Sequence, residues 1–342
     1  RGTGGGWQVG LTGVYTAYSD SLKPDKRQAY RKYNPTGIHF YNTSIDYGYI
    51  NHRMNINGET ALNDKGAVAT INAITLKASQ SLTLTAIQRF YSYRYYSMFS
   101  SAFSDGGKVQ NESGIYLGAA WNPSSRLSVL AYSDYAYFPW ARYLVSEKSH
   151  SLDNLIQASY RLSPLLTLNS RYRLRMREED YNDKELKSKY LIDKTEHRAR
   201  LSLVYANTHW SAKTQGDVSY VVYPDELSDK PSSFGWMVSQ NMAYTNSWIS
   251  AAANVGYFHT HDYNSRIYTY ENGTLYTFSF PMFYGEGVRG AMLLRGNIGS
   301  HLIILCKVGA TKYSDRDKIS SSYQQINSSW QADMDLQIRW KF

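Results

Sequence analysis

The sequence lacks the hydrophobic length that a membrane-spanning helix needs. No apolar run reaches the roughly 18 residues required to cross a bilayer as a helix, and the longest solid apolar run is 302–306. The mean hydropathy is −0.50. A long helical pattern is absent as well. Transmembrane β-strands remain compatible with this composition, because only every second residue of such a strand meets lipid.

Cysteine is almost missing, since Cys306 is the only one. A single thiol excludes an internal disulfide and a zinc site built from several thiolates. His259 and His261 share a face of an extended segment and could together bind a metal. A solvated pair of loop histidines is the preferred interpretation, because short motifs of this kind have little specificity. We therefore expect no metal and no cofactor.

Tyrosine, by contrast, is abundant. The 342 residues include 32 Tyr, 8 Trp and 11 Phe, and the formal net charge is +9. A tyrosine ring is apolar while its hydroxyl stays wet, which suits a membrane interface. The positive charge favours anionic partners, including lipopolysaccharide.

The final stretch, 329–342, carries the clearest pattern. Alternate positions from Ala332 to Phe342 are apolar, and the positions between them are polar or charged. Strand side chains alternate faces, so one face of this strand is fully apolar. Transmembrane barrel strands show this alternation with aromatic residues at the interfaces. Trp340 and Phe342 are accordingly interpreted as a carboxy-terminal insertion signal, read by the barrel-assembly machinery.

Similar segments recur along the whole chain, and short turns alternate with longer polar connections. This predicts an all-β fold, a transmembrane antiparallel outer-membrane β-barrel of about 16 strands (roughly 14–18), with short periplasmic turns and long extracellular loops. A soluble β-sandwich is the alternative. Three details of the prediction are a strand over 82–96, a charged loop over 178–194 and a hairpin around 272–273.

Several segments resemble one family. They read DYGYI (46–50), NGETA (57–61), QRFYSYRYY (88–96), TEHRARL (195–201), FYGEGVR (283–289) and LQIRWKF (336–342). Together they are similar to the carboxy-terminal barrel region of Bacteroidota outer-membrane helix-hairpin-helix (competence-type) proteins. The resemblance implies an upstream helix-hairpin-helix segment and further strands before residue 1. Residues 1–342 are thus either a single barrel or the carboxy-terminal part of a larger one. The family name implies DNA handling through the upstream segment, so no DNA-binding residue is carried onto this chain.

Strand alternation also places the charges. A basic wall is predicted on neighbouring strands facing the lumen: Arg161, Arg171, Arg173, Arg175, Arg177, Arg198, Arg200 and Lys213. Inward acidic positions are expected elsewhere, at Asp46, Glu59, Asp333 and Asp335. Opposed charges across a lumen can orient and select solutes. The alternative is that the arginines pair with Asp217, Glu178 and Glu179 and fill an occluded lumen.

Aromatic residues cluster over 90–96 and 132–140. An outer interfacial girdle is the preferred interpretation, and a stacking platform for sugars or bases is the alternative.

The sequence therefore predicts an integral outer-membrane barrel that is not an enzyme and serves as a channel for charged solutes or polyanions. The alternatives are a scaffold barrel within a larger outer-membrane assembly for secretion, nutrient uptake or envelope biogenesis, and a disfavoured outer-membrane hydrolase. Expected partners are outer-membrane lipid, lipopolysaccharide and other outer-membrane or periplasmic subunits. The sequence leaves open whether nucleic acid is a partner.

Overall fold

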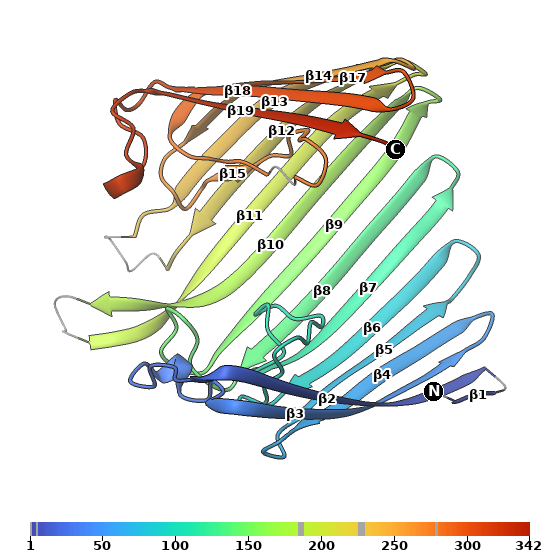
Figure 1. Cartoon of the computed structure of the whole chain (residues 1–342), viewed down its shortest axis with the longest axis vertical. Helices are drawn as coiled ribbons and strands as arrows, with labels where there is room; N and C mark the ends of the chain where they lie inside the picture. The colour runs from blue at the N-terminus through green and yellow to red at the C-terminus, as the bar shows by residue number, and fades with distance from the viewer. Residues whose placement is uncertain (1, 5, 184–187, 225–229, 278–279) are drawn as a thin grey trace. The chain divides into compact units, whose positions relative to one another are not determined.

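Antiparallel strands make up nearly all of the protein (Figure 1). The computed structural model describes residues 2–4, 6–183, 188–224, 230–277 and 280–342. Within these ranges, sixteen strands have ten or more residues, and seventeen strands in all share one sheet. The only helical elements in these ranges are two 3-10 turns, η1 (Ala29–Arg31) and η2 (Ser322–Gln324). None of the described helices has the length and apolar character to cross a membrane.

By its internal contacts the chain divides into two compact units. Unit 1 comprises residues 1–156 and 174–195, and unit 2 comprises 157–173 and 196–342. Unit 1 is an antiparallel meander in which each strand from β2 to β8 pairs with the next. Its strands are β1 (Gly2–Gly4), β2 (Trp7–Leu22), β3 (Gly37–Ile50), β4 (Met54–Asn63), β5 (Val68–Lys77), β6 (Leu82–Tyr91), β7 (Glu112–Ser124) and β8 (Leu127–Phe138).

Three long strands contribute residues to both units. They are β9 (Ser149–Ser163), β10 (Leu166–Asp183) and β11 (Ser188–Ala206). Unit 2 continues as a second meander, with β12 (Trp210–Val222), β13 (Ser233–Thr245), β14 (Ile249–Thr260), β17 (Glu286–Ile298), β18 (Leu302–Tyr313) and β19 (Trp330–Trp340). The connection between β14 and β17 carries two short paired strands, β15 (Ile267–Tyr268) and β16 (Met282–Phe283).

Connections of two lengths alternate along the meander. The periplasmic turns span only two to four residues, as at 51–53, 125–126 and 299–301. Most connections at the other end are longer, including 92–111, 261–285 and 314–329. The short exception at 64–67 turns on Gly66, whose φ of 70° lies in the left-handed region that glycine adopts without steric cost. The alternation predicted from the sequence is confirmed.

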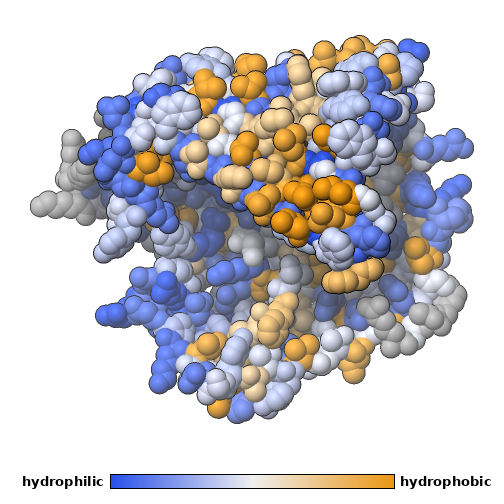
Figure 2. All heavy atoms as spheres, turned by 45° about the horizontal axis from the view of Figure 1, so that its top comes forward, coloured by the Kyte–Doolittle hydropathy of each residue, from blue (hydrophilic) through white to orange (hydrophobic). Residues whose placement is uncertain are grey.

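An exposed apolar face is clearest on the last strand of the chain. On β19, Met334, Leu336 and Ile338 are exposed to 66%, 62% and 65%. Asp333, Asp335 and Gln337 alternate with them on the other face. Where the last strands come forward, hydrophobic side chains gather in a band with hydrophilic side chains to either side (Figure 2). Side chains exposed in this way are suited to contact lipid rather than a protein core.

The inward faces hold small apolar clusters under the loops. In unit 1, Tyr91 and Tyr95 pack on Ala69. In unit 2, Ile267 and Phe283 of the β14–β17 connection pack on Met237 and Phe258. These clusters hold extracellular loops against the inward faces of the strands.

The structure corrects three local predictions. The strand predicted over 82–96 ends at Tyr91, because the chain turns at 92–95 and Tyr95 N–H donates to the Ser92 carbonyl. The charged segment 178–194 is mostly strand, since Lys189 pairs with Asp180 across β10 and β11 at 2.7 Å; residues 184–187 lie outside the described part. The hairpin predicted around 272–273 is present as the pair β15 and β16, but the two strands are joined by a connection wider than a turn at 272–273.

The lipid-facing assignment predicts a position-specific cost. Leu336→Arg should lower the free energy of unfolding by about 2–4 kcal/mol, the cost of a cation at the bilayer midplane. Leu336→Met keeps the side chain apolar and similar in volume, and should change it by less than about 1.5 kcal/mol. Urea unfolding in lipid vesicles measures both. Equal stability of the two variants would contradict contact with lipid at this position.

Candidate anion-binding site

Four of the predicted basic residues meet in unit 2. Arg171 and Arg173 lie on β10, and Arg198 and Arg200 lie on β11. Outward neighbours such as Tyr172 and Leu201 are exposed at 42% and 55%. Strand alternation therefore turns the four arginines to the inward face, as the sequence predicts.

The β14–β17 connection covers these arginines. Residues 261–285 fold inward so that β15 contacts β12 and β13. Its start is fixed by Asp262, which accepts hydrogen bonds from Ser233, from Asn264 and from backbone N–H groups. Burial raises the pKa of Asp262, but these hydrogen bonds outweigh it and hold the pKa below its ordinary value. The carboxylate therefore stays charged and keeps the turn in place.

A second anchor holds the middle of the same connection. Glu271 is 1% exposed and pairs with Arg289 at 2.9 Å and with Lys307 at 3.4 Å. Further along, the Leu275 N–H donates to Gln337 Oε1 at 2.8 Å. Buried charges need such partners because an unpaired one is costly to desolvate. The connection is thus built as a fixed inward element.

Between the connection and the strands lies a cavity of about 290 Å³. Five arginines line it, Arg171, Arg173, Arg198, Arg200 and Arg266, and among the described residues Asp217 is the one lining carboxylate. Positive side chains therefore outnumber negative ones among the described lining residues. Rings of Tyr268 and Phe280, stacked with centroids 6.4 Å apart, add an aromatic wall.

The one carboxylate is fully engaged. Arg200 Nε donates to Asp217 Oδ1 at 2.5 Å, and Gln215 Nε2 donates to Asp217 Oδ2 at 2.6 Å. Arg198 pairs more loosely, at 3.3 Å, with Glu196. Arg266 donates to the Tyr268 hydroxyl and to the Tyr263 carbonyl. These contacts leave the Nε donor of Arg198 without a partner in the described chain.

The other predicted arginines of β10 belong to a different group. Arg175 and Arg177 lie in unit 1, where both donate to Asp105 at 2.6 and 2.8 Å. The sequence interpretation placed partners at Asp217, Glu178 and Glu179. Asp217 pairs with Arg200, as predicted. Glu178 contacts His150, and Glu179 contacts Lys194. The remaining basic positions, Arg161 and Lys213, share the inward alternation but do not line the cavity.

The predicted acidic positions lie in two places. Asp46 and Glu59 are directly opposite one another on β3 and β4 of unit 1. In unit 2, Asp333 receives Arg289 at 2.6 Å, and Asp335 is opposite Lys307 in the β18–β19 register. Arg289 thus neutralises Asp333, and Asp335 lies across the strand pair from Lys307. The expected opposition of a basic and an acidic wall stays a prediction.

Sequence reasoning missed the most buried ion network. Arg89 is 1% exposed and pairs with Glu112 at 2.5 Å and with Asp134 at 2.7 Å. Glu112 also accepts the N–H groups of Asp105 and Gly106, which ties the β6–β7 loop inward. The alternation rule could have found Arg89, since its neighbour Phe90 is exposed and outward. Arg289 beside the exposed Val288 carries the same signal.

The aromatic cluster is only partly a girdle. Tyr135 and Tyr137 are exposed at 47% and 37% and face outward, as a girdle requires. Tyr91, Tyr95, Tyr96 and Phe138 are instead buried against loops, a correction to the predicted placement. Loop rings of Tyr33, Tyr93 and Trp140 contact one another at a pocket of about 570 Å³ in unit 1.

Trp340 and Phe342, at the end of the chain, are exposed at 59% and 111%.

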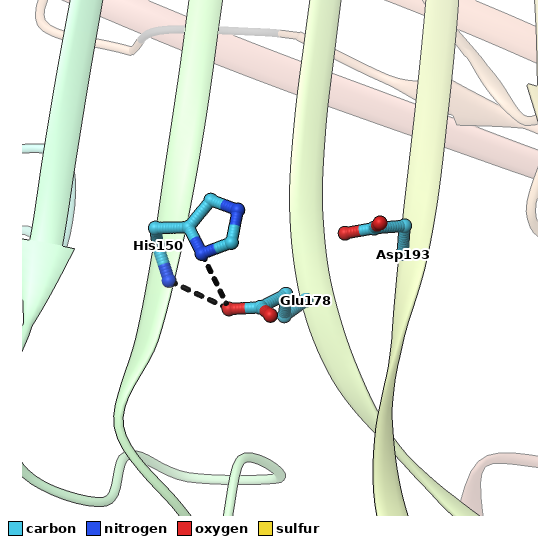
Figure 3. A group of neighbouring side chains, drawn as sticks. All are labelled: His150, Glu178 and Asp193. Atoms are coloured by element: carbon cyan, nitrogen blue, oxygen red, sulfur yellow. Dashed lines mark hydrogen bonds and ion pairs between the residues drawn. The ribbon is translucent and has the colours of Figure 1, made fainter.

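One group of side chains has the donors of a metal site. His150, Glu178 and Asp193 come from β9, β10 and β11 and offer ligand atoms within 4.8 Å of one another (Figure 3). His150 already contacts Glu178 at 3.0 Å. The group could accept a divalent cation, but exposed groups of this kind are common without one. His259 and His261 are not part of any such group among the described residues; His259 pairs with Glu286 at 3.5 Å.

Comparisons with known proteins point to one architecture. No family model matches the chain, and no curated protein matches it. Among solved structures, the FrpB iron transporter from Neisseria meningitidis is 12% identical with a TM-score of 0.53, covering 98% of this chain and 59% of that one. The RagAB peptide transporter is 10% identical with a TM-score of 0.50, covering 94% and 51%. OmpT of Vibrio cholerae is 9% identical with a TM-score of 0.46, covering 99% and 98%.

At these identities the likeness concerns the fold. Together with the outward apolar faces and the alternating connections, it identifies the chain as an integral outer-membrane β-barrel protein. In such a fold the charged side chains must point away from lipid, because a charge that faces lipid is costly. The arginine cavity is therefore on the side of the sheet that faces away from lipid.

Glu271, which anchors the 261–285 connection, and Asp333 both pair with Arg289. Substitution of these two carboxylates is predicted to lower the free energy of unfolding by different amounts. Glu271→Gln leaves Arg289 and Lys307 buried without their carboxylate and should lower the free energy of unfolding by about 3–5 kcal/mol. Asp333→Asn removes a partner whose side chain is 41% exposed and should cost at most about 1 kcal/mol.

Urea unfolding in detergent, together with limited proteolysis of the 261–285 connection, separates the two variants. Faster cleavage is expected only for Glu271→Gln. A larger loss for Asp333→Asn would show that Glu271 is not the anchor.

Proposed function

We propose that the protein binds anionic solutes and lets them pass across the outer membrane. The observation that carries this proposal is the arginine cavity, in which five guanidinium groups face one carboxylate. A concentration of one charge sign beside low-dielectric walls raises the local concentration of the opposite ion. Rings of Arg or Lys are a recurring basis of anion selectivity in pores.

The chemistry of arginine supports this assignment. A guanidinium remains charged at any physiological pH and offers donors in a planar fork that suits carboxylate and phosphate. Arg171 and Arg173 stand two residues apart on β10, as Arg198 and Arg200 do on β11. Two neighbouring strands thereby present four such forks to the same space.

A scaffold barrel is the second candidate, and one observation favours it. Long loops fold inward in both units and are fixed by buried ion networks, around Glu112 in unit 1 and Glu271 in unit 2. A barrel whose inward loops stay fixed would carry no current and would serve as a support for other envelope components. Conductance distinguishes the two candidates.

Planar-bilayer recordings of the full chain test the proposal. We expect ohmic conductance with a reversal potential that shows preference for chloride over potassium in a salt gradient. Arg173→Glu should lower the anion-to-cation permeability ratio about fivefold, since a charge change near the path corresponds to about 1 kcal/mol.

The matched control is Arg126→Glu, which makes the same charge change in the exposed 125–126 turn and should leave the ratio unchanged. An unselective current that ignores both variants would refute anion selection. A silent bilayer would favour the scaffold candidate.

A further inference from the structure

We infer that the arginine cavity of unit 2 is a specific binding site for an organic phosphate, a dianionic phosphate group joined to a flat apolar body. This rests on the proposed handling of anionic solutes and names the class of solute. Its evidence is the donor arrangement of the cavity, independent of whether the barrel conducts.

Two polar atoms in the cavity wall lack a protein partner. Arg198 Nε and Ser219 Oγ are both shielded from solvent and have no hydrogen-bond partner within the described chain. Both residues line the cavity. A buried polar atom left unsatisfied costs free energy that a suitable ligand recovers on binding. Arg198 Nε can only donate, and the Ser219 hydroxyl can donate, so both suit an acceptor oxygen.

The donors of the cavity wall suit a phosphate group better than a single carboxylate. Five arginines line the cavity, and Arg198 Nε and the Ser219 hydroxyl are donors without a partner in the described chain. Glu196 receives Arg198 through Nη2 at 3.3 Å, so the Nε donor of the same guanidinium stays available. A phosphate monoester carries close to two negative charges at neutral pH and offers three acceptor oxygens, one more than a carboxylate.

The remaining wall is suited to the rest of the ligand. Tyr268 and Phe280 present rings inclined by 25° to one another at the edge of the cavity. Arg198 and Arg266 lie 5.8 and 5.9 Å from the Tyr268 ring centroid, so the charged and aromatic walls are adjacent. An aromatic body can stack on these rings while its phosphate meets the guanidinium groups.

The test uses phenyl phosphate as the probe, titrated calorimetrically into the detergent-solubilised full chain at fixed chloride concentration. Inorganic phosphate and phenol are the comparison ligands. We expect phenyl phosphate to bind about 2–10-fold more tightly than inorganic phosphate, because stacking adds to the ionic contacts, and phenol not to bind measurably.

Two serines provide a matched pair of variants. Ser219→Ala removes the hydroxyl in the cavity wall and should weaken phenyl phosphate binding about tenfold, the usual loss for a hydrogen bond to a charged group. Ser239→Ala removes a hydroxyl that is equally buried and also lacks a partner, but that does not line the cavity. It should leave the affinity within about twofold, since it makes no contact with the ligand.

Arg198→Lys retains the charge but loses the Nε donor, and should also weaken binding about tenfold.

Equal effects of the two serine variants, or equal affinity for inorganic phosphate and phenyl phosphate, would overturn the inference. So would displacement of the probe by a modest increase in chloride. Binding without current would retain this inference and refute the pore. Anion-selective current without binding would refute this inference alone.

Discussion

The structure depends on the need to satisfy every backbone polar group while one face of each strand lies against lipid. Hydrocarbon offers no hydrogen bonds, so the strands must pair with one another. The period of two then sends alternate side chains to lipid and to the inward face. On β19 this places Leu336 against lipid and its neighbours Asp335 and Gln337 on the inward side. Charged residues collect on the inward face because the lipid-facing positions exclude them.

The charged side chains on the inward face set a second requirement, because each of them must be paired with an opposite charge or solvated by water. Unit 1 meets it with Arg89, Glu112 and Asp134, and unit 2 with Arg289, Glu271 and Asp333. In each case a loop contributes to the network, through Glu112 contacts to the 105–106 backbone or through Glu271 itself. The ion networks thus determine where the loops lie. The arginine cavity differs because two polar atoms of its wall, Arg198 Nε and Ser219 Oγ, have no partner in the described chain.

This difference separates structural charge from charge that is available to a ligand. A fully paired arginine such as Arg89 stabilises a loop and has little left to offer a solute. In the cavity, Arg198 keeps an unpartnered donor beside Ser219. A buried donor without a partner costs the folded state free energy. The proposed anionic ligand would supply the acceptor that Arg198 Nε lacks.

The sequence by itself determined which residues face which way. Alternation is local, so Arg171, Arg173, Arg198 and Arg200 could be placed inward from the chain alone. The tertiary structure decided which carboxylate meets which arginine. Asp105 reaches Arg175 from 70 positions away, and Glu271 reaches Arg289 only because a long connection folds inward. The paths of the loops follow from long-range packing and ion pairing. The local alternation of side chains in the sequence carries no information about either. For the same reason, only the tertiary structure shows that the 261–285 connection covers the arginines and encloses the cavity.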